Sequence, residues 1–548
     1  MSLRKNRQTL VIDRFAAHVS QTTMNTLHSL STTLGSRMKK CLATVSVCGL
    51  MIAVLLGGFG SVNVSLAQEW KFVPVGPPML MTDVQIAVPN AESAVPNAPD
   101  VAFESVNLTL DAVSQPPAVN HDILRRGIDG INFLGSTCGC LPPDTNAAVS
   151  NDFVAEATNF RFRVWNKTPG NQLIDESLAT LFGSPSNGDP YVVYDDIANR
   201  WYVSAFDSPI QGLLLAVSFD GNPVHGFQTF HLVGPPLPVG ELDYAKMGFN
   251  RDAIFITFND FSPGGGAGAK IIAIDKLAAF AGQLRFFVST PRFQFRAMPP
   301  AQMHGDQTGG VEWFVSTDGT DASGSTMRVT RMTQYLSNSP NFIYTSLPVT
   351  PYRNTPRADQ PGGSITTFPN TTTTQVQFRR GRLVTAMASG TPADNFTYPK
   401  ALIFDIDVTS GTPTLVHQFV VNPGVGVAAQ MPSVDMDANN MLGLTWMESS
   451  ATEFLSMWVA TLDGGTGRLT STVAAPGAGF FSANVRIGDY STTVLDPDGT
   501  TFWSANEYIG DAGTTDIWRT AIQSFVADPN ASSTAIVPIA SSTAIPGR

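Results

Sequence analysis

A two-part unit recurs along the middle of this 548-residue chain and constrains its fold more than any other feature. Each copy has a short polar opening motif and, about ten residues later, a run of alternating apolar and small polar residues that is typical of a strand. The clearest copies are PPDTNAAVSNDFVAEATNF from Pro142, GDPYVVYDDIANRWYVSAFD from Gly188, LDYAKMGFNRDAIFITFND from Leu242 and GDYSTTVLDPDGTTFWSANEY from Gly488. Weaker copies begin at Met303, Thr374 and Met431.

The spacing of these copies predicts the fold. They begin about 45 to 70 residues apart, which leaves room for four strands with variable outer loops, whereas a solenoid would have tighter and more uniform periods. A ring of four-stranded sheets buries both faces of each sheet and exposes only short edges. We therefore expect an all-β fold, a single β-propeller of about seven four-stranded blades, although six or eight blades also fit the spacing.

Composition and turn signals agree with this expectation. The chain has 47 Gly, 38 Pro and only 14% charged residues, which suits short strands and tight turns rather than a helical bundle. Turn sequences at residues 250–252, 380–381 and 498–499 fall between the first two strands of their units. The one predicted helix is the short segment KLAAFAGQ from Lys276, on the outside of the propeller.

The N-terminus has the three-part pattern of a secretory signal. Basic residues from Arg37 precede a long apolar run, and Ser65 and Ala67 supply the small residues of a cleavage site, so we expect cleavage after Ala67. The alternative is an uncleaved membrane anchor, because the run is close to the roughly 20 residues that span a bilayer. Translation can start at Met1 or Met38, so residues 1–67 are treated as an N-terminal extension and signal peptide.

The rest of the chain divides by composition. We expect residues 68–128 to be a Pro- and Ala-rich linker or tail, 129–527 the propeller and 528–548 a disordered tail. Residues 1–67 hold seven of the 33 Lys and Arg and one of the 44 Asp and Glu, which leaves a net charge of −17. Such an acidic protein repels nucleic acid and anionic lipids. We expect it to be secreted, periplasmic or on the cell surface, with no transmembrane span after cleavage.

Only two cysteines, Cys138 and Cys140, remain after residue 67. A disulfide between them is conceivable in an oxidising compartment, but its short span would strain it. Two thiols without nearby His or Cys partners do not make a zinc site. A structural or labile pair is the simpler interpretation.

Three long segments resemble a group of uncharacterised bacterial secreted proteins. They are PPDTNAAVSNDFVAEATNFRFRVWNK, GDPYVVYDDIANRWYVSAF and GDYSTTVLDPDGTTFWSANEY, which match a PPDTNG-type opening, a GDP-type second blade and a final GDYS with FW and NEY. The resemblance covers most of residues 130–525 and implies a secreted, sialidase-like propeller without an assigned activity. This chain has Ala147-Ala148-Val149-Ser150 where the group has Gly-Ala-Val-Gly, so its first turn is expected to differ.

The opening motifs predict a ring of polar residues at one mouth of the propeller. Its expected ligand-binding members are Asp144, Asp189, Asp243, His304, Gln375 and Asp489, with Asp306 as an alternative to His304 and Ser433 in a further unit. Converging carboxylates repel one another unless a cation or donor network relieves them, so Asp144, Asp189, Asp243 and Asp489 form a candidate calcium site. The simpler interpretation is that each Asp caps its own strand or turn, and we favour it. No cofactor other than calcium is expected.

Enzymatic roles have less support. A sialidase needs an arginine triad and a Tyr–Glu pair. The chain has three candidate arginines, Arg200, Arg486 and Arg519, and candidate catalytic residues can be assigned at Asp189, Arg486, Asp489, Tyr490 and Glu507. No spacing between these residues requires a sialidase site. The segments at Val217 and Val315 match an Asp-box only partly. No HExxH, GxSxG or nucleotide-binding motif occurs. Five tryptophans on predicted strands could stack on sugars, but core packing explains them more simply: Trp165, Trp201, Trp313, Trp446 and Trp503.

These observations favour an exported binding or scaffold module that presents polar loops to a glycan, protein or cell-envelope partner. The alternatives are a glycoside hydrolase or polysaccharide lyase that uses the mouth carboxylates, and a structural surface protein. A glycosidase pair would lie about 5 to 10 Å apart around an open cleft. A structural protein would have a filled, narrow channel.

Overall fold

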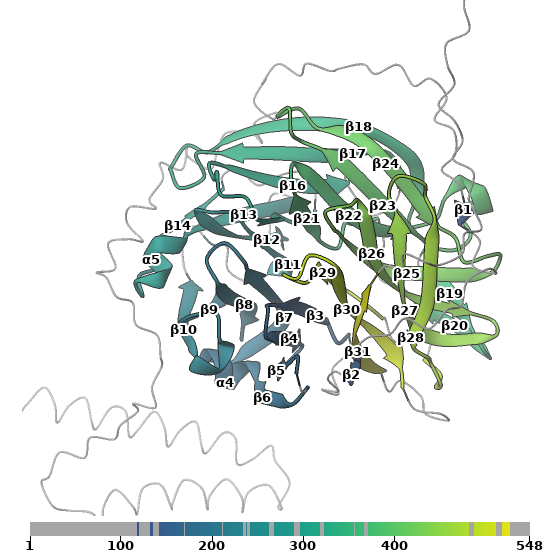
Figure 1. Cartoon of the computed structure of the whole chain (residues 1–548), viewed down its shortest axis with the longest axis horizontal. Helices are drawn as coiled ribbons and strands as arrows, with labels where there is room; N and C mark the ends of the chain where they lie inside the picture. Colours follow the sequence, from purple (N-terminus) through teal and green to yellow (C-terminus); the bar gives the residue numbers. More distant parts are fainter. Residues whose placement is uncertain are drawn as a thin grey trace, which may run out of the picture. The chain divides into compact units, whose positions relative to one another are not determined.

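A computed structural model describes the backbone and side chains of most of residues 142–526 (Figure 1). Residues 169, 211, 234–236, 238–241, 262–267, 290–295, 318–322, 356, 367–370, 482–486 and 511–517 are outside this description. The backbones of two short strands before residue 142 are also described, β1 (Ala118–Val119) and β2 (Asn132–Leu134). The proposed signal peptide, Cys138, Cys140, Arg486 and residues 528–548 therefore lie outside the described residues.

The described chain is nearly all β and contains seven consecutive units of short antiparallel strands. Unit 1 has β3 (Asn146–Val149), β4 (Phe153–Thr158), β5 (Arg161–Asn166) and β6 (Gln172–Ser177), and unit 2 has β7 (Ser186–Asp195), β8 (Arg200–Asp207), β9 (Gly212–Ser218) and β10 (Phe227–Val233). Unit 3 has β11 (Leu242–Phe249), β12 (Ala253–Asp260), β13 (Gly268–Asp275) and β14 (Phe286–Val288), and unit 4 has β15 (Ala301–His304), β16 (Val311–Thr317), β17 (Ser323–Thr333) and β18 (Asn341–Arg353).

The remaining units follow the same order. Unit 5 has β21 (Val376–Arg379), β22 (Arg382–Ser389), β23 (Lys400–Asp407) and β24 (Thr414–Val421), and unit 6 has β25 (Val427–Met436), β26 (Met441–Ser450), β27 (Glu453–Asp463) and β28 (Leu469–Ala475). Unit 7 has β29 (Thr492–Leu495), β30 (Thr501–Ile509) and β31 (Trp518–Val526), and β2 is its fourth strand. A separate hairpin, β19 (Arg357–Gln360) and β20 (Gly363–Thr366), lies between units 4 and 5 in the sequence.

The first strands of the units contact one another in chain order. β3 contacts β7, β7 contacts β11, and β25 contacts both β21 and β29. β15 pairs in parallel with both β11 and β21, so a ten-stranded sheet runs through units 3 and 5. The first strand of the last unit, β29, also contacts β3 of the first. At the chain start, β2 pairs with β31, and β1 pairs in parallel with the outer strand β24 of unit 5.

Apolar side chains fill the junction between each pair of neighbouring units. Seven clusters each lie mainly between two adjacent units, and one of them joins unit 7 to unit 1. This last cluster contains Val149, Trp165 and Trp503, each 4% exposed. The cluster between units 2 and 3 also contains Tyr490, just before β29. All five tryptophans named above are buried, as core packing predicts.

The turns and the helix that the sequence predicts are found at the expected positions. The predicted turns at 250–252, 380–381 and 498–499 connect the first two strands of units 3, 5 and 7. The predicted helix is α5 (Lys276–Phe280), and a second short helix, α4 (Leu178–Phe182), was not expected. It begins where Ser177 caps the amide of Thr180 and ends at Gly183, which has a φ of 65°. Among the described residues, no helix has the length and apolarity that crossing a membrane requires.

Candidate functional site

The opening motifs place a kink at the start of several first strands. Asp144, Asp189, Tyr244 and Met431 have φ angles of 57°, 51°, 58° and 43°, a region that non-glycine residues rarely adopt. In β7, β11 and β25 the strand register shifts at the kink, as in a β-bulge. The kink turns the side chains of the opening motif away from the regular alternation of the strand.

The carboxylates at these kinks connect one unit to the next. The side chain of Asn159 donates to Oδ2 of Asp144 at 2.6 Å and accepts from the backbone N–H of Asp189 at 2.8 Å. Asp189 in turn accepts from the backbone N–H of Tyr244 at 2.8 Å. The expectation that each Asp caps its own turn is therefore wrong for Asp189, which caps the opening of the following unit. Asn159 was not recognised from the sequence.

A buried lysine lies next to this acidic group. Lys246 is 1% exposed, and its Nζ lies 3.5 Å from the ring centroids of both Tyr244 and Tyr490. Burial lowers the pKa of Lys246 well below its ordinary value, although the charges of Asp189, Asp144 and Asp243 oppose this shift. The only signal for it in the sequence is a lysine inside the otherwise apolar strand LDYAKMGF.

The remaining residues of the predicted mouth differ in exposure. Asp243 is exposed, whereas Asp489 is 7% exposed. Tyr490 is 1% exposed and donates its hydroxyl to Oδ2 of Asp189 at 3.1 Å, not to Glu507. Burial, together with the charges of the nearby Asp residues, raises the pKa of Tyr490 well above its ordinary value. Glu507 is fully buried in β30.

Further along the first strands, buried polar side chains join different units. The amide of Gln377 donates to Oε1 of Gln302 at 3.3 Å, which connects units 5 and 4. Ser433 Oγ lies 2.9 Å from Oγ1 of Thr493, which connects units 6 and 7. Gln375, expected at the mouth, is fully buried and donates to the backbone carbonyl of Thr493. Hydrogen-bonded side chains thus occupy the space between these first strands.

His304 lies at the opposite end of the first strands from the Asp cluster. It is the last residue of β15, not an opening residue, because the strand already begins at Ala301, two residues before the weak sequence copy at Met303. Asp306 lies in the turn that follows. Nδ1 of His304 lies 3.0 Å from Oδ1 of Asp196, and the backbone N–H of Gly305 donates to Oδ2 of Asp196 at 3.1 Å. Burial pushes the pKa of Asp196 up, but the His304 ring and Arg379 outweigh it and hold it below its ordinary value.

The carboxylates do not gather as metal ligands. Within the described ranges, no three His, Cys, Asp or Glu side chains are grouped so that they could hold a metal ion. Asp144, Asp189, Asp243 and Asp489 all belong to these ranges.

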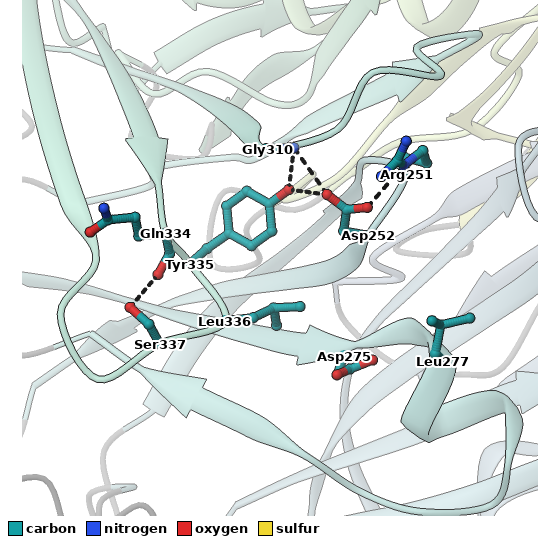
Figure 2. A pocket seen from close by; sticks show the side chains of 9 residues that line it. All are labelled: Arg251, Asp252, Asp275, Leu277, Gly310, Gln334, Tyr335, Leu336 and Ser337. Atoms are coloured by element: carbon teal, nitrogen blue, oxygen red, sulfur yellow. Dashed lines mark hydrogen bonds and ion pairs between the residues drawn. The ribbon is translucent and has the colours of Figure 1, made fainter.

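A pocket of about 670 Å³ lies between loops of units 3 and 4 (Figure 2). Its lining comes from the β11–β12 turn, the start of α5, the turn before β16 and the loop after β17. Figure 2 shows the hydroxyl of Tyr335 pointing at the carboxylate of Asp252, to which it donates at 2.8 Å. The pocket lies at the end where the first strands of these units finish, and sequence reasoning did not find it.

Comparisons with known proteins give only distant likenesses. No family model and no curated protein sequence matches the chain. Solved structures that resemble it include a protein of unknown function from Dyadobacter fermentans, with 10% identity over 73% of this chain and 99% of that one, at a TM-score of 0.37. A neuraminidase-like protein from a little yellow-shouldered bat isolate has 10% identity over 63% and 100%, at 0.34. An endo-arabinase from Bacteroides thetaiotaomicron has 12% identity over 48% and 89%, at 0.28.

Proposed function

We propose that the chain is an exported protein built on a closed β-propeller of seven blades, and that it binds a glycan, protein or cell-envelope partner without catalysing a reaction. Closure is supported by the contact between β29 and β3, and by the apolar cluster that joins unit 7 to unit 1. Each of the seven units then corresponds to one blade. The four-stranded unit 7, completed by β2, supports a propeller that begins near residue 129 and ends near 527.

The observation that carries the binding role is that polar side chains fill the space between the first strands. A retaining or inverting glycosidase needs two carboxyl groups about 5 to 10 Å apart that both reach the substrate. Asp144 and Glu507 are 1% and 0% exposed, and Asp189 accepts hydrogen bonds from Tyr244 and Tyr490. Asp144, through Asn159, and Asp189 connect neighbouring units, and Glu507 is buried, which leaves the surface loops for recognition.

The test measures binding and turnover on the same substrates. The full-length protein is incubated with a panel of bacterial and plant cell-wall polysaccharides, and both retention on the insoluble polymer and release of reducing ends are measured. The proposal predicts retention on at least one polymer and no product release. Product release that disappears in Asp189→Asn would contradict it and would support the glycoside hydrolase alternative.

A further inference from the structure

The pocket between units 3 and 4 has a polar side that is already organised. Asp252 accepts from the Tyr335 hydroxyl at 2.8 Å and from the backbone N–H of Gly310 at 3.0 Å on Oδ2, and from Nε of Arg251 at 3.0 Å on Oδ1. Nη1 of Arg251 also donates to the carbonyl of Gln307 at 3.1 Å. The bonds of Asp252 to Tyr335 and Gly310, and of Arg251 to Gln307, cross from unit 3 to unit 4. They hold the polar groups of the pocket in place in the absence of a ligand.

The other side of the pocket is apolar and open to solvent. Leu277, in the first turn of α5, is 80% exposed, and Leu336 is half-buried. In Figure 2 both leucines lie below the Tyr335–Asp252 network, near the carboxylate of Asp275. Apolar side chains beside a few fixed polar groups are the lining that small-ligand pockets use, and the volume of about 670 Å³ falls within their usual range.

The charges of the pocket are matched within the protein. Arg251 pairs with Asp252, and Oδ2 of Asp275 accepts from Nη1 of Arg285 at 2.9 Å. Burial raises the pKa of Asp252, but its hydrogen bonds from Tyr335 and Arg251 outweigh this and lower the pKa, so the carboxylate stays ionised. An acidic or basic ligand would have to compete with these pairs. A neutral ligand with hydroxyl groups can donate to the carboxylates and accept from the half-exposed guanidinium of Arg251 without breaking them.

We infer that this pocket binds a neutral oligosaccharide, with the C–H face of a sugar ring against Leu277 and Leu336 and its hydroxyl groups on Arg251, Asp252 and Asp275. This inference rests on the proposed binding function and names its ligand class and site. A sugar ring combines an apolar face with a polar edge, which matches the two sides of the pocket.

The experiment titrates the full-length protein with hexasaccharides of cellulose, xylan, mannan and arabinan, and with oligogalacturonate and chitosan oligomers as charged counterparts, by isothermal calorimetry. Leu277→Asp disrupts the apolar side of the pocket, and Arg251→Ala disrupts its polar side. Leu277→Asp should fold normally, because an acidic residue is favourable in the first turn of a helix. Val425→Asp is the matched control, since Val425 is fully exposed in the loop between β24 and β25 and does not line the pocket.

We expect a neutral hexasaccharide to bind, both pocket variants to lose about tenfold or more in affinity, and Val425→Asp to stay within about twofold of the wild type. Preferential binding of a charged oligomer, or neutral binding that neither pocket variant weakens, would overturn the inference. Failure of every hexasaccharide to bind would overturn it as well, while retention on another envelope component would leave the binding function standing. Turnover of any oligomer would contradict the binding function itself.

Discussion

The amine nitrogen of Lys246 lies 3.5 Å from the ring centroid of Tyr490, so a side chain of unit 3 packs against the opening motif of unit 7. The ring of Tyr244 lies at the same distance from this nitrogen, and Tyr191 of unit 2 lies at 6.0 Å. Three units therefore meet around one amine. Cation–π attraction favours its charged form, whereas burial opposes it.

Replacing Lys246 by Met should reduce the pH dependence of stability on the alkaline side. The folded pKa of Lys246 is lowered, so between that pKa and the ordinary value near 10.5 the unfolded chain binds more protons than the folded one. Stability of the wild type should then rise with pH in this window, by at most about 1.4 kcal/mol per pH unit. Urea unfolding of both proteins between pH 6 and 10 measures it. Parallel curves for the two proteins would contradict the prediction.

Asn159→Ala should destabilise the protein by about 1 to 3 kcal/mol, because it removes the amide that connects Asp144 to Asp189 and leaves a buried carboxylate oxygen without this donor. The measurement is chemical denaturation at neutral pH. Asn151→Ala, at an exposed turn position, is the control and should change stability by less than about 0.5 kcal/mol. Equal effects of the two substitutions would show that the bridge does not stabilise the junction.

The Asp196–His304 contact should stabilise the protein at neutral pH and lose this effect in acid. The folded pKa of Asp196 is lowered, so its contribution is present above the unfolded pKa, near 3.9, and disappears as the pH falls through the folded pKa. Asp196→Asn should cost less than about 1 kcal/mol at pH 7, because the carboxylate is partly exposed, and less at pH 2 than at pH 7. Asp220→Asn, which breaks a more exposed Asp–His pair, should have no measurable effect at either pH.

Calcium and EDTA should leave the thermal unfolding of the full-length protein unchanged, within about 1 °C. Asp144 and Asp189 already accept hydrogen bonds from protein donors, and a ligand raises the midpoint only if it binds the folded state more tightly than the unfolded state. A calcium-dependent rise of several degrees that Asp189→Asn abolishes would instead establish the calcium site.

Chains that begin at residue 136 should be less stable than chains that begin at residue 129, because β31 then loses the pairing of Asn132–Leu134. Both truncations remove β1, so the comparison isolates the contribution of β2. For a domain of about 400 residues the midpoint should fall by about 1 °C for each kcal/mol lost. Differential scanning calorimetry of the two truncated proteins decides the matter. Identical midpoints would mean that β2 adds nothing to unit 7.

The structural features that depend on residues adjacent in the sequence were predicted correctly. Turn chemistry placed the loops at 250–252 and 498–499, and α5 was visible as a short apolar and Ala-rich segment. The site residues were harder, because their roles depend on residues far along the chain. Asn159 matters through Asp189 of the next unit, and Asp196 through His304 two units later.

The position of His304 in its strand was also not predictable from the sequence. Its strand has only four residues, so the alternation that marks longer strands could not reveal where it ends. The pocket was invisible for a further reason. Its polar side joins Arg251 and Asp252 to Tyr335, and nothing in either segment alone indicates the other.

The pairing of β2 with β31 also sets an order of events during synthesis. Asn132–Leu134 leaves the ribosome long before Trp518–Val526 is made, so β2 can pair only after the last strand, β31, has been synthesised. Loop closure over such a distance is slow compared with the formation of a hairpin such as β30–β31. A chain interrupted before residue 518 would lack β31, so β30 and β2 would each have an unpaired edge.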